Sequence, residues 1–154
     1  NTKLTTGSPE TSGRAGEALS RYFDEDGNTI GQVFVKAGKV KPDGYVPFLV
    51  EIRKTPERYY RLNSFYLEFV SEVNQPSILI EPSGQLFNGM EFSQIGSVVR
   101  VGVPYAGKRG NSTILINFLA ENAAFAGDGL RLNSMLELDS GTGIASLLIN
   151  PATE

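Results

Sequence analysis

Apolar and polar residues alternate along this chain from residue 30 almost to its end. In residues 45–53 every second side chain from Val46 to Ile52 is apolar, and in residues 63–70 the same holds from Phe65 to Phe69. A repeat of two indicates a β-strand with one buried face, because successive side chains of a strand point to opposite sides. The alternation predicts nine strands, at residues 32–36, 45–53, 63–70, 77–81, 90–95, 98–103, 113–119, 130–138 and 145–150.

Turn-forming residues separate these segments, for example at residues 41–44 (Lys-Pro-Asp-Gly), 88–89 (Asn-Gly) and 127–129 (Gly-Asp-Gly). The 154 residues include 17 Gly, 8 Pro, 9 Phe and 6 Tyr, which suits a protein of many turns and aromatic strands. No long helical stretch alternates with the strands, so a parallel α/β sheet is not expected. The pattern predicts an all-β domain, a sandwich or jelly roll, built around one core.

The first part of the chain has a different composition. Residues 1–28 are polar and rich in Gly, Ser, Thr and charge, and are expected to form a flexible N-terminal segment before the β-sandwich domain of residues 29–154. Within this segment, residues 17–23 have a pattern that predicts a short helix, since Leu19, Tyr22 and Phe23 would share one side of it. The acidic and glycine residues at 24–27 would end that helix.

Composition excludes several classes of function. Cysteine and histidine are both absent, which removes disulfides, thiolate metal sites, the usual general base and any Ser-His-Asp arrangement. The net charge of −3 does not favour binding to nucleic acid, and no apolar stretch approaches the length of a membrane span. Glu68, Glu81, Glu91 and Glu137 would make a glycosidase pair only if two of them faced each other, and nothing in the sequence pairs them. We therefore expect no enzyme activity, no catalytic residue and no cofactor.

Several segments carry a resemblance to a known family. A Pro-Asp-Gly turn leads into the strand at 45–53, and similar turn and strand features recur at residues 62–69, 84–89, 127–130 and 141–145. Together they resemble cohesin modules and related sandwiches of carbohydrate-binding type, although residues 71–76 (Ser-Glu-Val-Asn-Gln-Pro) replace the usual aspartate-proline pair. The resemblance implies a nine-stranded antiparallel β-sandwich of jelly-roll type. It also implies a flat sheet face, which binds a dockerin module in true cohesins.

Outward-facing residues of three expected strands are the main candidates for a binding site. Tyr66 and Glu68 lie on one strand, Arg100 on a second, and Met135 and Glu137 on a third. If these strands are neighbours, the side chains form a patch in which Met and Tyr supply adaptable area and the charged groups supply orientation. The sequence therefore predicts a protein-binding face at these five residues.

A second candidate is an aromatic and basic cluster formed by Arg58, Tyr59, Tyr60 and Arg61. The rings could stack on a partner while the guanidinium groups donate hydrogen bonds to it. The alternative is that these tyrosines cover the rim of the sandwich.

A third candidate concerns calcium. Asp24, Asp26 and Asn28 alternate like the first three ligands of a calcium loop. The spacing then fails, because Gly27 occupies the fourth position instead of the sixth and Val35 occupies the twelfth, where an acidic residue is needed. A solvated turn is the favoured interpretation, so no metal site is predicted.

The predicted function is that of a non-catalytic protein–protein interaction or assembly module, cohesin-like, whose partner is a dockerin-type module or a neighbouring subunit. Carbohydrate binding is an alternative, with polysaccharide as the ligand, although the chain has no Trp to supply the usual row of exposed rings. A virion coat or decoration protein is a further alternative. The resemblance implies an extracellular or cell-surface location within a larger secreted protein or assembly, and no membrane insertion is expected.

Overall fold

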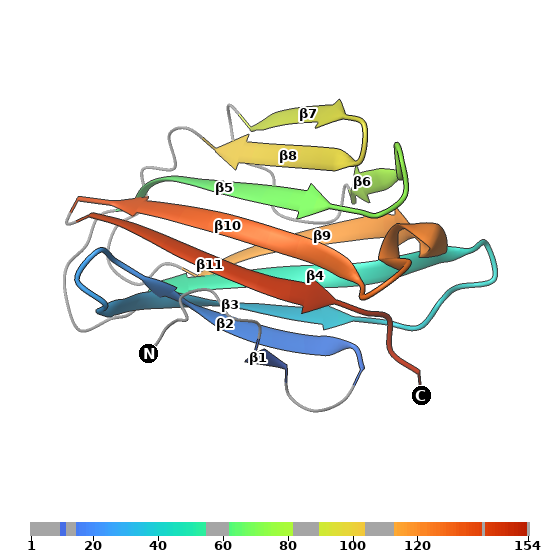
Figure 1. Ribbon diagram of the computed structural model, residues 1–154, viewed down its shortest axis with the longest axis horizontal. Coiled ribbons are helices and arrows are strands. Elements are labelled where there is room, and N and C mark those ends of the chain that lie inside the picture. Colours follow the sequence, from blue (N-terminus) through green and yellow to red (C-terminus); the bar gives the residue numbers. More distant parts are fainter. Residues whose placement is uncertain are drawn as a thin grey trace.

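The computed structural model describes residues 10–11, 15–54, 62–81, 90–103, 113–139 and 141–153, which form an all-β structure (Figure 1). The strands are β1 (Glu10–Thr11), β2 (Glu17–Phe23), β3 (Thr29–Ala37), β4 (Tyr45–Lys54), β5 (Leu62–Val70), β6 (Ile78–Ile80), β7 (Glu91–Ile95), β8 (Val98–Val103), β9 (Thr113–Glu121), β10 (Leu130–Leu138) and β11 (Gly141–Ile149). Within these ranges the one helical element is a 3-10 turn, η1 (Asn122–Phe125). The all-β prediction is confirmed, and each of the nine expected segments overlaps one of β3 to β11.

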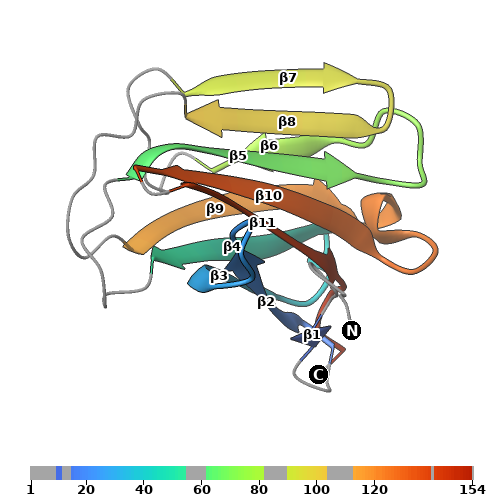
Figure 2. The ribbon, with the colours of Figure 1, turned by 60° about the vertical axis from the view of Figure 1, so that its left-hand side comes forward.

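All strands belong to one antiparallel sheet. Ten of them follow the order β6-β9-β4-β3-β2-β11-β10-β5-β8-β7, and β1 pairs with β2 beside this path. The expected number of nine strands is therefore too low, because β1 and β2 were not foreseen. The sheet is strongly curled, so that β5 comes to lie over β4 and β9 (Figure 2).

Aromatic packing inside the curl joins the two layers. The ring of Phe69 on β5 lies 5.7 Å from that of Phe48 on β4 and 5.1 Å from that of Phe118 on β9. Phe48 and Phe118 are themselves stacked at 5.1 Å, and Phe125 of η1 meets Phe48 edge-on at 6.2 Å. Because β5 stands far from β4 and β9 in the order of the sheet, these contacts exist only where the sheet folds back over itself.

Alternate residues of each long strand build this core. In β10, Leu130, Leu132, Leu136 and Leu138 are buried together with Ser134, while the residues between them are partly exposed. The same alternation holds in β4 and β9. The interior face of the curl thus takes the apolar half of the alternation, and the exterior face takes the polar half.

The predicted helix at residues 17–23 is wrong, because this segment is β2. Ala18, Ser20 and Tyr22 point inward, whereas Leu19 and Phe23 lie on the other side of the strand. Two of the three inward residues are small or polar, so the segment lacks the apolar alternation that marks the other strands. The residues are instead held by pairing, since β2 lies next to both β3 and β11.

Tyr22 is the largest polar side chain of the interior. Its exposed fraction is 0%, and its hydroxyl shares a hydrogen bond of 2.6 Å with the Ser134 hydroxyl on β10. Burial raises the pKa of Tyr22 well above its usual range, and the hydrogen bond with Ser134 lowers it by a smaller amount. Gly143 of β11 leaves room for this arrangement, because a Cβ there would lie 3.0 Å from the Tyr22 Cβ.

Among the residues described, none belongs to a helix long and apolar enough for a membrane crossing.

Candidate functional site

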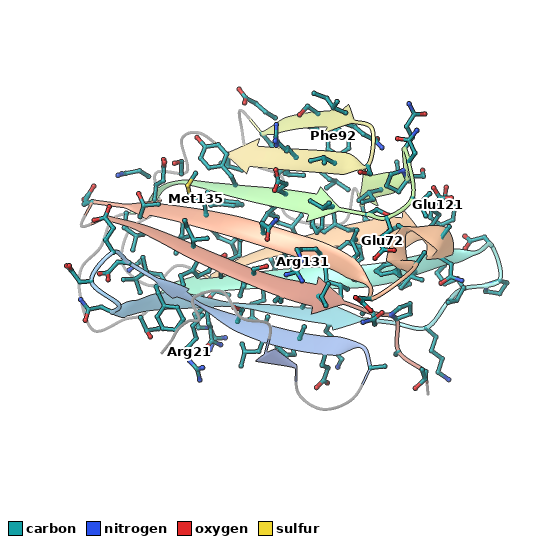
Figure 3. All side chains as sticks on the ribbon, viewed as in Figure 1. Arg21, Glu72, Phe92, Glu121, Arg131 and Met135 are labelled. Carbon is teal, nitrogen blue, oxygen red and sulfur yellow. The ribbon has the colours of Figure 1, made fainter. Side chains whose placement is uncertain are left out.

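A groove of about 530 Å³ lies on the outward face of the sheet, over β5, β8, β10 and β11 and beside β7. Four of the five residues predicted to bind a protein line it: Tyr66, Glu68, Arg100 and Met135. The strand register brings them together. Tyr66 lies opposite Met135, and Glu68 lies opposite Arg100. Figure 3 labels Met135 on β10 and Phe92 on β7, another residue that lines the groove.

A row of hydrogen-bonded polar side chains crosses four strands, beginning with Arg100, Glu68 and Asn133 in the lining of the groove and ending at Ser146 and Arg131, which do not line it. Arg100 Nε on β8 donates to Glu68 Oε2 on β5 at 3.0 Å, and Asn133 Nδ2 on β10 donates to Glu68 Oε1 at 3.2 Å. Ser146 Oγ on β11 donates to Asn133 Oδ1 at 2.9 Å and accepts from Arg131 Nη1 at 2.8 Å. We call these five residues the polar row. Each of these side chains is oriented by a hydrogen bond to a side chain on an adjacent strand.

An apolar row runs parallel to the polar row, two residues further along the strands. It consists of Gly102, Tyr66, Met135 and Ile144, which the register places side by side. A Cβ on Gly102 would lie 2.9 Å from Tyr66 Cδ1 and 3.1 Å from Cε1, so the tyrosine ring lies directly over the glycine backbone. Ile144 is 58% exposed, although a large aliphatic side chain gains by leaving water. Covering the exposed part of the apolar row would therefore favour a complex.

The groove is lined by charges of both signs, those of Glu68, Glu91 and Arg100. The Arg100 side chain is 62% exposed and the Glu68 side chain 32%, so their ion pair adds at most about 1 kcal/mol to stability. Its main effect is positional. The guanidinium has five N–H donors in one plane, and the bond to Glu68 fixes that plane while leaving other donors for a ligand.

Glu137, the fifth predicted residue, is not among the residues that line the groove. Its Oε1 accepts a hydrogen bond from Ser64 Oγ on the adjacent β5. The structure thus places it on the same face, four positions along β5 from the register position of Glu68. The predicted aromatic and basic cluster at residues 58–61 lies outside the described residues.

The calcium candidates form the turn between β2 and β3. Asp24 Oδ1 accepts hydrogen bonds from the backbone N–H groups of Asp26 at 2.9 Å and Asn28 at 2.8 Å, and Asn28 Nδ2 donates to Asp24 Oδ2 at 3.4 Å. The Asp24 carboxylate thus caps its own turn, as aspartate side chains commonly do. Across the described ranges, no group of three acidic, His or Cys side chains is placed to hold a metal ion.

Sequence reasoning missed part of the face. Asn133 and Arg131 have the same outward phase as Met135 and could have been found by extending that phase along β10. Ser146 has the outward phase of the expected strand at residues 145–150 and could have been found in the same way, whereas Ile144 precedes that segment and belongs to β11 because this strand begins at Gly141. The alternation of residues along a strand does not show which strands are its neighbours in the sheet. The polar row depends on this order of strands, so the sequence pattern could not predict it.

Comparisons with known proteins give a fold-level likeness. A scan against protein-family models and a search of curated proteins both give no match. Among solved structures, the chain is similar to a cohesin module from a family 33 glycoside hydrolase of Clostridium perfringens, with 14% identity and a TM-score of 0.49 over 80% of this chain and 99% of that module. It is also similar to a collagen-binding domain from a Staphylococcus aureus adhesin, with 11% identity and a TM-score of 0.45 over 86% of this chain and 97% of that domain. The first of these is the kind of module that the sequence pattern resembles.

Proposed function

We propose that this chain is a non-catalytic binding module that recognises another protein through the groove on β5, β8, β10 and β11. The observation that carries the proposal is the polar row beside the apolar row. A surface whose only task is solubility needs no side-chain hydrogen bonds that continue from strand to strand. Protein interfaces, in contrast, combine an apolar centre with polar groups that fix orientation.

The polar row lowers the cost of binding. Immobilising a long side chain on association costs about 0.5–1.5 kcal/mol, and this cost is reduced where the side chain is already held. Arg100 and Arg131, the two longest side chains of the row, both bond to neighbours before any partner arrives. Their remaining N–H groups can bond to carboxylates or carbonyls of the partner.

The apolar row supplies the anchor. Tyr66, Met135 and Ile144 form adjacent apolar positions on three neighbouring strands, and an apolar side chain of the partner would cover them. Tyr is enriched at binding hot spots, and Met adapts its shape to a bound side chain. The tyrosine ring is held over Gly102, so the anchor is rigid on one side and adaptable on the other.

The finer form of the proposal is a cohesin-like jelly-roll module in an extracellular or cell-surface assembly, with a dockerin-type module or a neighbouring subunit as its partner. The support for it is the resemblance of residues 38–53 and 62–69 to cohesin modules. The position of the groove on one broad sheet face is compatible with this form.

Calorimetric titration with a panel of dockerin-type modules tests the proposal. For a module that binds, Tyr66→Ala and Arg100→Ala should each weaken the affinity by more than about tenfold, because each removes an interface anchor. Melting temperatures should change little. Arg53→Ala is the matched control, since Arg53 is an exposed arginine on β4 whose ion pair with Glu51 lies outside the groove.

Two results would contradict the proposal. One is that the two groove variants bind as tightly as the unaltered chain, which would place the binding surface elsewhere. The other is that the chain is retained on insoluble polysaccharide and loses this retention in Tyr66→Ala, which would make the groove a carbohydrate site.

A further inference from the structure

Strand β7 forms one end of the curled sheet (Figure 2). It pairs with β8 over its whole length of 5 residues, and all five residues are exposed. Within the described part of the chain no strand pairs with its other side. Phe92 is 48% exposed and Ile95 is 76% exposed, so two of the large exposed apolar side chains of the molecule lie on this short strand.

The β7 edge is held in place by the residues beside it. Gln94 Nε2 donates to the Pro76 carbonyl at 2.9 Å. The turn that follows β7 is also fixed, because the Gln75 N–H donates to the Gly96 carbonyl and the Ser71 N–H to the Ser97 carbonyl, each at 3.0 Å. These bonds prepare β7 for pairing, since a strand that is already in place loses little entropy when it pairs.

The other end of the sheet has a different character. Strand β6 has only 3 residues. In the sequence Pro76 precedes it, and Glu81 and Pro82 follow it directly. Short length, proline and charge are the usual devices that keep an edge strand from pairing with another chain. β7 is longer, with 5 residues, contains no Pro, carries a single charge at its first residue, Glu91, and has no bulge in its register with β8. Of the two ends of the strand order within the described residues, β7 is therefore the one more open to a further strand.

The backbone groups that face this free edge follow from the hairpin geometry. A turn of two residues, Gly96 and Ser97, joins Ile95 to Val98, and the pair that flanks such a turn is hydrogen-bonded. Pairs alternate along an antiparallel ladder, so Glu91, Ser93 and Ile95 bond towards β8. The N–H and C=O groups of Phe92 and Gln94 then point away from β8, to the free edge.

We infer that two copies of this chain associate through their β7 strands, antiparallel, with a two-fold axis at Ser93. In this register Phe92 bonds to Gln94 of the partner subunit, and Gln94 to the partner's Phe92, so both sets of free backbone groups are satisfied. Glu91, the one charged residue of the strand, faces the partner's Ile95, and no two charges oppose each other. A strand must be complementary to itself for a two-fold interface, and β7 meets this condition.

The pairing has a consequence for the groove, which goes beyond the proposed function. The two-fold axis of an antiparallel strand pair is perpendicular to the sheet, so the outward faces of both copies point to the same side. Because Glu91, Phe92 and Ser93 of β7 border the groove, the two grooves become parts of one continuous surface. Such a dimer presents two polar rows to a partner at once, which favours bivalent binding.

Analytical ultracentrifugation over a range of concentrations tests the inference. The unaltered chain should show a reversible monomer–dimer equilibrium. Ser93→Lys should weaken the dimer by more than about tenfold, because it places two ammonium groups opposite each other at the two-fold axis. Ser93→Glu should have the same effect, and an equimolar mixture of the two variants should restore a dimer that native mass spectrometry identifies as mixed.

Leu79→Lys on β6 is the matched control, because it adds the same charge at the other edge of the sheet and should leave the dimer intact. Circular dichroism shows whether each variant keeps its fold. A chain that stays monomeric at the highest concentrations overturns the inference, as does a dimer that persists in Ser93→Lys or a mixture that stays monomeric. Tyr66→Ala should remain dimeric, so a failure of the proposed groove function is distinguished from a failure of this pairing.

Discussion

The inward and outward sides of β5 differ in how they are held. On the inward side, Phe65, Leu67 and Phe69 are buried, and Phe69 contacts rings of the opposite layer. On the outward side, Tyr66 and Glu68 lie in the groove and meet their neighbours on the adjacent strands. The inward side is held by packing, which is strong and has little direction, whereas the outward side is held by hydrogen bonds that fix direction and add little stability. The two-residue repeat of one strand thus puts the packing that stabilises the fold on one side and the residues proposed to bind a partner on the other.

The largest expected effect comes from the inward side. Phe69→Ala should lower the free energy of unfolding by about 3–5 kcal/mol, because it opens a cavity where β5 meets β4 and β9. Denaturant unfolding followed by circular dichroism measures this loss. A loss below about 1 kcal/mol would mean that the two layers are not joined through this ring.

A smaller effect is expected at the polar contact of the interior. Tyr22→Phe removes the hydroxyl that bonds to Ser134 and should cost about 1–2 kcal/mol at neutral pH. Because burial raises the pKa of Tyr22 in the folded chain, the folded state resists ionisation that the unfolded state undergoes near its ordinary pKa of about 10. The contribution of Tyr22 is therefore complete below that pH and is lost as the pH rises above it.

The measurement is the free energy of unfolding between pH 8 and pH 11, a range of about three units that spans the ordinary tyrosine pKa. Stability of the unaltered chain should fall more steeply above about pH 10 than stability of Tyr22→Phe. The other tyrosines titrate in both proteins, so the difference between the two curves isolates Tyr22. Parallel curves would show that the Tyr22 hydroxyl ionises as readily in the folded state as in the unfolded one.

The two sides of β5 also show which features a sequence can predict. Alternation identified the segments of β3 to β11 and the outward phase of Tyr66, Glu68, Arg100 and Met135, because a buried apolar face imposes a repeat of two on each strand. It missed β2, whose inward residues include Ala18 and Ser20 and whose Tyr22 is satisfied by Ser134, far away in the sequence. A contact of that kind leaves no local signal.

For the candidate site, the outward residues of each strand could be predicted from the sequence, but the way they come together could not. The phase of each strand is local and was found, whereas the order β8-β5-β10-β11 is set by packing of the whole curl. The polar row links residues between 13 and 65 positions apart in the sequence, so its existence follows only from that order. The outward side chains could be proposed singly, but not as a connected row.

The smallest effect on stability is expected at the outward side, at the ion pair of Arg100 and Glu68. Glu68→Gln keeps the shape of the side chain and one acceptor oxygen but removes the charge that faces Arg100. Because both side chains are substantially exposed, the coupling energy from a double-mutant cycle with Arg100→Gln should be about 0.2–1 kcal/mol and should fall as salt is added. Thermal or denaturant unfolding of the four proteins at low and high salt gives this energy. A coupling of several kcal/mol, unaffected by salt, would mean that the outward side of β5 stabilises the fold as strongly as the inward side does. The proposed difference between the two sides of the strand would then be wrong.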